Sequence, residues 1–284
     1  MALLLNSYAY VTDKYVHTNI FTTAGTYTWI CPSNVTSVTA VAIGGGGSGY
    51  VNGGGAGGGG GLGIKFNIPV TPGASYTVVV GSNNSNQNPN LAAGTSWFIS
   101  TSTVAGSGGR NGSYPNPTGG AGGGFIGDAG GTGGKGGNGN VASRGAGGGG
   151  AGGYTGAGGA GGNAGVAGQP STGAGGGGGG GGCLTSPVNY DFAFGAPGGG
   201  TGISPFIKSN GAGGSTGTIT AFAGVGIGGS GGGNGVLSTP TISGIGGSYG
   251  GGGGSGAGDK NTIPSAFQAT RGSGGAVAIY YDAL

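Results

Sequence analysis

Hydrophobic and polar residues alternate along several short stretches in the first third of the chain, which is the pattern of half-buried β-strands. Residues 26–31 (TYTWIC) alternate Tyr, Trp and Cys with Thr and Ile, and residues 62–70 (LGIKFNIPV) place large apolar side chains on one face. Residues 35–43 (VTSVTAVAI) are apolar on both faces and predict a central strand. The same reasoning predicts strands within residues 8–21, 76–81 and 96–100.

The end of the chain carries one more stretch of this kind, residues 276–284 (AVAIYYDAL), and we predict that it closes the sheet begun near the N-terminus. Turns are expected at Ala24-Gly25 and Pro72-Gly73. No long stretch has helical periodicity, and dense glycine destabilises an α-helix by about 1 kcal/mol per residue relative to alanine. We therefore expect an antiparallel β-sheet or sandwich with essentially no α-helix.

Glycine changes this picture beyond residue 43, because it supplies 88 of the 284 residues and recurs at every third position in several runs. Such runs span residues 124–139, 147–168 and 244–256. A period of three matches the polyproline II helix, which has no internal hydrogen bonds, so neighbouring segments must satisfy its backbone. The predicted fold class is all-β plus polyglycine II, with a glycine-rich bundle of polyglycine II helices beside the sheets.

Two alternatives for the glycine-rich part stay open, a collagen-like trimer and a disordered linker. The 12 prolines are too few for collagen, and a disordered linker does not hold a fixed phase. The predicted domains are residues 1–100 with 275–284, a β-strand-rich anchoring domain, and residues 101–274, a polyglycine II bundle with recognition loops.

The run from Gly147 to Gly168 sets the scale of the bundle. Unbroken, it would extend about 68 Å, so it must fold back near its middle or form a longer rod. Its third-position glycines are expected to face neighbouring segments. Tyr154, Thr155, Asn163 and Val166 are expected on the other edges.

Charge and reactive side chains argue against catalysis. The chain has 8 basic and 5 acidic residues, the acids are all aspartates far apart in sequence, and the basic residues are scattered rather than clustered for nucleic acid. The single histidine, His17, is expected in a sheet or an interface. Cys31 and Cys183 match no metal or redox spacing and are interpreted as buried small residues. We predict no enzyme activity, no cofactor and no metal.

The order of the strand and glycine motifs carries a family resemblance. The stretches TAGTYTWICPSNVTSVTAVAIGGGGSG, GGGAGGGGGLGIKFNIPVTPGASYTVVVGS and GTSWFI, and the final GSGGAVAIYY, resemble the glycine-rich domain of bacteriophage tail-fibre and virion proteins. By composition and period, the middle resembles the polyglycine II adhesins at the tail-fibre tips of T-even-type phages. In those adhesins, loops at the distal end of the bundle bind an outer-membrane receptor.

Bulky residues of the middle region gather where the glycine runs are interrupted, at residues 110–118 and 183–210. Aromatic side chains on loops of a rigid scaffold are typical of recognition surfaces, although the phenylalanines could equally pack into a small satellite core. The candidate receptor- or partner-binding residues are Tyr114, Asn116, Tyr190, Asp191, Phe192, Phe194, Phe206 and Lys208.

The resemblance implies a bacteriophage tail-fibre or tail-tip adhesin that is made in the host cytoplasm and carried on the virion. Its expected partners are a host surface receptor (an outer-membrane protein or glycan), a tail or fibre protein bound through the N-terminal region, and further copies of itself, with a trimer as one option. No nucleic acid and no membrane insertion are expected. The alternatives are a non-adhesive structural virion protein of the capsid or tail and, third, an ice-binding protein.

Overall fold

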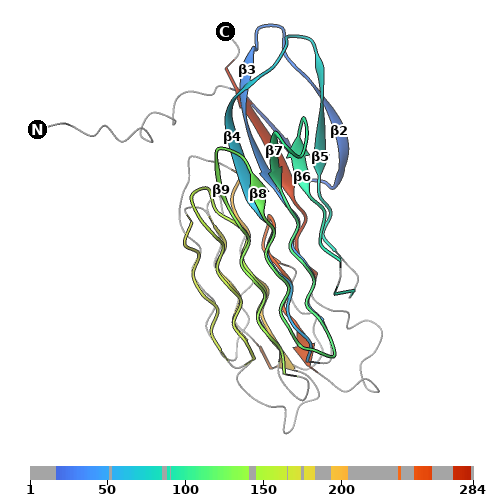
Figure 1. Ribbon diagram of the computed structural model, residues 1–284, viewed down its shortest axis with the longest axis vertical. Coiled ribbons are helices and arrows are strands. Elements are labelled where there is room, and N and C mark those ends of the chain that lie inside the picture. The colour runs from blue at the N-terminus through green and yellow to red at the C-terminus, as the bar shows by residue number, and fades with distance from the viewer. Residues whose placement is uncertain are drawn as a thin grey trace, which may run out of the picture.

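Two packed β-sheets form one end of the molecule, and extended glycine-rich segments run from them to the other end (Figure 1). The computed structural model describes residues 17–50, 53–84, 88–89, 91–140, 145–164, 166–173, 176–182, 193–203, 236–237, 246–257 and 271–282. These residues contain β-strands and no helix, which confirms the all-β prediction. That the glycine-rich segments are polyglycine II helices stays a prediction.

The first sheet contains the N-terminal and C-terminal strands side by side, in the order β1-β13-β3-β4-β9. The C-terminal strand pairs antiparallel with its neighbours on both sides, placing Ile279 opposite Asn19 and opposite Ala40. The prediction that the last strand closes this sheet is confirmed. Its strands are β1 (His17–Phe21), β13 (Ala276–Tyr281), β3 (Ser37–Ile43), β4 (Leu62–Pro69) and β9 (Ala129–Gly131).

The second sheet has the order β2-β5-β6-β7-β8, and all its pairs are antiparallel. Its strands are β2 (Gly25–Ile30), β5 (Ser75–Val80), β6 (Ser96–Phe98), β7 (Val104–Gly106) and β8 (Phe125–Ile126). A small third sheet joins β10 (Ala193–Phe194) to β11 (Val236–Leu237) and β12 (Gly256–Ala257). The strands from β7 to β12 were not predicted. Two or three residues are too few for alternation to stand out, and β6, which is equally short, was predicted only from the bulky stretch SWFIS around it.

Apolar side chains fill the space between the two large sheets. Trp29 and Phe98 meet edge to face with ring centroids 5.7 Å apart, and Cys31 is buried in the same cluster, as predicted. Cys183 lies outside the described residues. A second apolar cluster covers the other face of the first sheet and includes Tyr154. The expected edge position of Tyr154 is therefore wrong: its ring is buried, and its hydroxyl donates to the Gly202 carbonyl at 2.9 Å.

The glycine-rich segments form a lattice in which the hydrogen-bond partner changes with a three-residue repeat. In segment 53–61 the N–H groups turn in succession to three different neighbours. Gly55, Gly58 and Gly61 donate to segment 107–113, Ala56 and Gly59 donate to segment 131–139, and Gly57 and Gly60 donate to segment 250–253. Its carbonyls accept from three more segments, residues 44–50, 120–123 and 149–152. Segment 53–61 thus has six neighbours.

Segment 146–153 occupies a second central position of the same kind. It donates to segments 156–162, 196–199 and 57–60, and it accepts from segments 134–137, 177–180 and 252–255. The run from Gly147 to Gly168 folds back at Tyr154 and Thr155, since Gly147 N–H bonds to the Gly162 carbonyl at 2.8 Å and Gly153 N–H to the Gly156 carbonyl at 2.9 Å. Of the two predicted outcomes for this run, folding back is the one observed.

Close contact between backbones explains the glycine content of the lattice. A Cβ atom on Gly58 would lie 2.2 Å from the Ala121 carbonyl oxygen, and one on Gly59 would lie 2.0 Å from the Gly150 carbonyl oxygen. No ordinary contact is that short, so a side chain at either position would force the segments apart. At Gly124, on the surface of the lattice, a Cβ atom would meet nothing within 4 Å.

Candidate functional site

The far end of the lattice, opposite the two large sheets, contains turns between glycine-rich segments and strands of the small third sheet (Figure 1). Tyr50 ends the segment that leaves β3, and Tyr114 follows the segment that leaves β7. Their rings stack with centroids 5.5 Å apart and an interplanar angle of 13°, and both are half-buried. The hydrogen bond from Ser113 N–H to the Thr118 carbonyl, 2.9 Å long, closes the turn that carries Tyr114 and the exposed Asn116.

Asparagine side chains accept N–H groups of adjoining lattice segments near this end. The Asn138 side-chain oxygen accepts from Gly119 N–H at 2.9 Å, and the Asn163 oxygen accepts from Asn138 N–H at 2.8 Å. The Asn111 oxygen accepts from Ser48 N–H at 2.9 Å in the same way. Each amide oxygen takes the place that a backbone carbonyl of a neighbouring segment holds elsewhere in the lattice. These three side chains therefore fasten adjoining segments together.

The structure brings together only part of the predicted binding set. Tyr114 and Asn116 share one turn at the far end, and Phe194 lies in β10, paired with Val236 and Gly256. Tyr190, Asp191, Phe192, Phe206 and Lys208 lie outside the described residues. Tyr50 was not predicted as a site residue. Like Tyr114, it follows a glycine-rich stretch, and this shared position in the sequence could have identified it.

The lattice also has a broad lateral face, which the sequence pattern did not predict. It consists of five consecutive neighbours, segments 107–113, 118–124, 131–139, 156–163 and 166–173, which hydrogen-bond side by side. Every third residue of these segments points outward, and none of these outward residues is buried. They are Ser107, Arg110 and Ser113; Thr118, Ala121 and Gly124; Thr132, Lys135 and Asn138; Ala157, Ala160 and Asn163; and Val166, Gln169 and Thr172.

The register of the hydrogen bonds aligns these outward residues into rows across the segments. Arg110 N–H bonds to the Ala121 carbonyl, Gly161 N–H to the Lys135 carbonyl, and Gln169 N–H to the Ala160 carbonyl. Gly136 N–H bonds to the Gly120 carbonyl, which sets Lys135 level with Ala121. The middle row therefore reads Arg110, Ala121, Lys135, Ala160 and Gln169. The signal in the sequence was the repeat Gly-Gly-x, whose variable position faces solvent.

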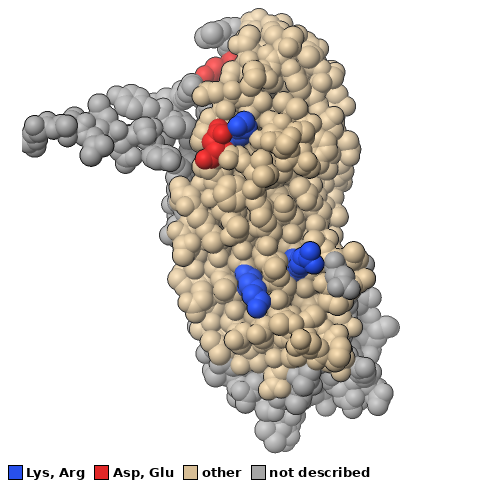
Figure 2. All heavy atoms as spheres, in the orientation of Figure 1, with Lys and Arg blue, Asp and Glu red and all other residues tan. Residues whose placement is uncertain are grey.

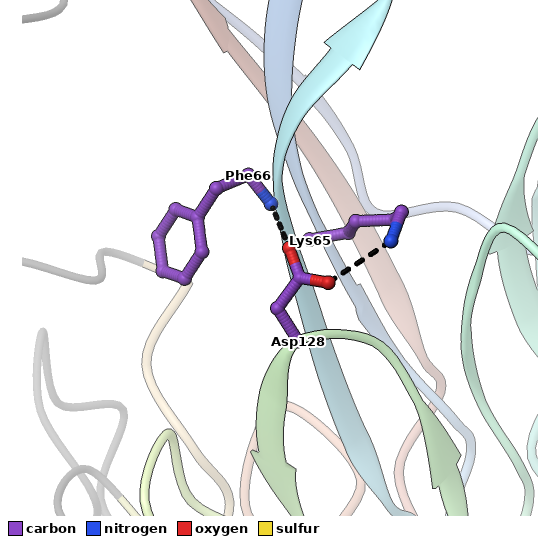
Figure 3. Close-up of polar contacts among 3 residues, drawn as sticks. All are labelled: Lys65, Phe66 and Asp128. Atoms are coloured by element: carbon purple, nitrogen blue, oxygen red, sulfur yellow. Dashed lines mark hydrogen bonds and ion pairs between the residues drawn. The ribbon is translucent and has the colours of Figure 1, made fainter.

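An ion pair fixes the β8–β9 hairpin to β4, where the lattice meets the sheets (Figure 3). Lys65 Nζ lies 2.9 Å from one carboxylate oxygen of Asp128, and Phe66 N–H donates to the other at 2.9 Å. The hydrogen bond from the Phe66 backbone, together with Lys65, lowers the pKa of the Asp128 carboxyl. Over the glycine-rich half of the face that Figure 2 shows, basic side chains stand apart on an otherwise uncharged surface.

Other reactive side chains of the described residues occupy structural positions. His17 stacks on Tyr281 in the first sheet with ring centroids 5.6 Å apart, and burial raises the pKa of the Cys31 thiol. Within the described ranges no three His, Cys, Asp or Glu side chains gather in a way that could hold a metal ion. Nor does this part of the chain contain a helix with the length and apolar character needed to cross a membrane.

These features define an all-β protein whose larger part is a hydrogen-bonded lattice of glycine-rich segments. The family comparison agrees: the model of the glycine-rich domain matches residues 22–219, well over half of the chain, so the chain belongs to this glycine-rich domain family. The match begins just before β2 and includes both central lattice segments. The predicted glycine-rich domain is thereby confirmed. No curated protein matches the chain.

Proposed function

We propose that this protein is a bacteriophage tail-fibre or tail-tip adhesin, which presents binding loops on a rigid glycine-rich scaffold. The observation that carries the proposal is the stacked pair of Tyr50 and Tyr114 at the far end of the lattice, with the exposed Asn116 in the same turn. Half-buried aromatic side chains held by a rigid frame lose little conformational entropy on binding and are frequent hot spots.

The arrangement of the chain supports a division of labour between the two ends. The large sheets contain the packed apolar cores, whereas the far end contains turns with aromatic and amide side chains. An adhesin of this kind would attach to the virion through its β-sheet end and bind a host outer-membrane protein or glycan through its turns. Many copies on one particle would turn modest single-site affinity into strong attachment.

The test is binding of the labelled full chain to a panel of bacterial cells and their purified envelopes. Tyr114→Ala should weaken binding at least about tenfold, the loss typical of a hot-spot residue. Tyr27→Ala is the matched control, because Tyr27 is also half-buried and forms an aromatic pair with Phe21. Tyr27 lies on β2, in the sandwich formed by the two large sheets and away from the far end. Equal binding by wild type and the Tyr114 variant, or no binding to any envelope, would contradict the proposal.

The alternatives differ in class and in their own tests. A non-adhesive structural virion protein would be found on the capsid shell or along the tail, so imaging of intact particles separates it from a tail-tip adhesin. An ice-binding protein would need a regular array of small residues. The lateral face has the regular array, but Arg110, Lys135 and Gln169 interrupt it, so its composition does not favour ice. A thermal-hysteresis assay tests this third option.

A further inference from the structure

The lateral face of the lattice carries unpaired cationic side chains in its middle row. Within the described part of the chain, Arg110 and Lys135 are exposed, and their side chains have no ionic or hydrogen-bond partner. The carboxylate of Asp128 pairs with Lys65 instead. The described carboxylates, Asp128 and Asp282, lie at the β-sheet end, not on the lateral face. Among the described residues, the charges on this face are therefore all positive, with no carboxylate beside them on the face.

The backbone of the same row also offers hydrogen-bond donors to solvent. The carbonyls of Ala121, Lys135 and Ala160 accept bonds from adjoining segments, but among the described residues their N–H groups have no acceptor. The flanking side chains are small enough to leave these groups accessible: Ala121, Ala160 and Gly124 add at most a methyl group. A ligand that lies flat on the face can thus reach donors from the backbone and charge from Arg110 and Lys135.

We propose that the lateral face binds an acidic polysaccharide that lies across the lattice segments along the middle row. Arg110 and Lys135 are two hydrogen-bonded segments apart, roughly 10 Å at the usual spacing of paired extended chains. This separation is on the scale of a disaccharide repeat, so carboxylate or phosphate groups on alternate sugars meet both cations. Sugar hydroxyls accept from the free N–H groups of the row, with Ala121 between the two cations and Ala160 beyond Lys135.

A second copy of the chain is a poorer occupant of the face. Two lateral faces brought together would bring Arg110 and Lys135 of one copy against the same cations of the other. The long side chains of Arg110, Lys135 and Gln169 would also hold the two backbones apart, beyond hydrogen-bonding distance. The exposed backbone groups can therefore bind a ligand but cannot pair with another lattice segment. Charged residues on an edge strand prevent pairing with a second chain in the same way.

The experiment measures binding of the full chain to three immobilised polysaccharides: one with carboxylates, one with phosphodiesters, and neutral dextran. The paired substitution Arg110→Gln with Lys135→Gln is compared with Lys65→Gln and Arg271→Gln, which removes the same charge outside the lateral face. We expect wild type to bind one or both acidic polymers, with binding that falls as salt rises, and to ignore dextran. The Arg110→Gln and Lys135→Gln double variant (the lateral pair) should lose about tenfold in affinity for the acidic polymer. The Lys65→Gln and Arg271→Gln double variant (the control pair) should lose less than about twofold.

Several results would overturn the proposal: no binding of wild type to either acidic polymer, equal losses in the two paired variants, or dextran bound as well as the acidic chains. Association of the Arg110 and Lys135 variant into larger species, with polysaccharide binding unchanged, would assign these cations to blocking self-contact instead. The proposal is independent of the adhesin function. Tyr114→Ala should leave polysaccharide binding intact, and the lateral pair should leave intact any binding that Tyr114 supports.

Discussion

Packed side chains stabilise the sandwich, whereas backbone hydrogen bonds stabilise the lattice, although strands of the sandwich continue directly into segments of the lattice. Ile43, the last residue of β3, pairs with Leu62, the first residue of β4, and the adjoining residues Gly44 and Gly61 are already joined by a lattice hydrogen bond. In the sandwich the large side chains bury apolar surface between sheets. In the lattice the absence of side chains lets each backbone reach up to six others.

This contrast predicts that the two regions respond differently to changes in volume. In the sandwich, removing atoms leaves a cavity and costs hydrophobic free energy. In a central lattice segment, adding a single methyl group breaks hydrogen bonds to several neighbours at once. The most informative experiments therefore delete side-chain volume from one region and add it to the other.

Phe98→Ala should have the largest effect. Phe98 is fully buried and packs against Trp29 and Tyr76, so we expect a loss of about 3–5 kcal/mol in the free energy of unfolding. Denaturant unfolding followed by Trp fluorescence measures it. Ile126→Ala is the control at an exposed strand position and should cost less than about 1 kcal/mol. A small effect of Phe98→Ala would show that the lattice, not the sandwich core, dominates stability.

Gly59→Ala should come next, at about 3 kcal/mol, because its Cβ atom would overlap the Gly150 carbonyl oxygen and the backbone cannot move aside cheaply. Gly124→Ala is the matched control, since the same methyl group would point into open space. That substitution should be neutral or stabilise by up to about 1 kcal/mol, because alanine restricts the unfolded chain. Thermal unfolding of both variants measures the contrast. Similar losses in the two would refute the role assigned to close backbone contact.

The same contrast explains how much of the molecule was predictable. Alternation indicated strands such as β2, β4 and β5, of which one face packs against an apolar core, and β3 stood out because it is apolar on both faces, which two apolar clusters cover. The three-residue glycine period indicated segments that pair through backbone. It could not show which segments pair, because glycines are interchangeable and carry no partner-specific chemistry. Pairing is decided by chain connectivity and by the sheets that start and end the segments.

The candidate site was predictable only where its residues interrupt the glycine pattern. Tyr114 and Asn116 stand out in a proline-flanked turn, but Tyr50, which stacks on Tyr114, looked like the end of a glycine run. The lateral face needed the register of five segments, which is set by hydrogen bonds between neighbouring segments and joins Arg110 to Gln169 only through the segments between them. Tyr154 was misplaced because its period fits an edge, whereas the turn after Gly153 points its ring into the apolar cluster on the first sheet.

Asn138→Ala sharpens the comparison at the end of the lattice. It removes the oxygen that accepts Gly119 N–H, so we expect a loss of about 1–2 kcal/mol in the free energy of unfolding. Asn138→Asp retains an acceptor at the same place and should recover most of that loss. Amide hydrogen exchange gives a local readout, with faster exchange of Gly119 N–H in the alanine variant only. Unchanged exchange there would show that the asparagine does not fasten the two segments.

The smallest expected effect is electrostatic and lies where the two regions join. The Phe66 N–H bond and Lys65 lower the pKa of Asp128 in the folded protein, so this carboxylate stabilises the fold at pH above its unfolded pKa. The contribution is lost as pH falls through the lowered folded value. Because Lys65 and Asp128 are both more than a third exposed, screening limits it to about 1 kcal/mol or less.

Asp128→Asn should therefore lower stability slightly at neutral pH and reduce the loss of stability on acidification. Denaturant unfolding at neutral pH and at pH below the ordinary aspartate range measures both effects, with Asp282→Asn as the control carboxylate away from the hairpin contact. Added salt should weaken the difference between wild type and Asp128→Asn, because it screens the attraction to Lys65 but leaves the Phe66 hydrogen bond in place. A pH dependence equal in wild type and Asp128→Asn would mean that the junction is held by backbone pairing of β4 with β9 alone.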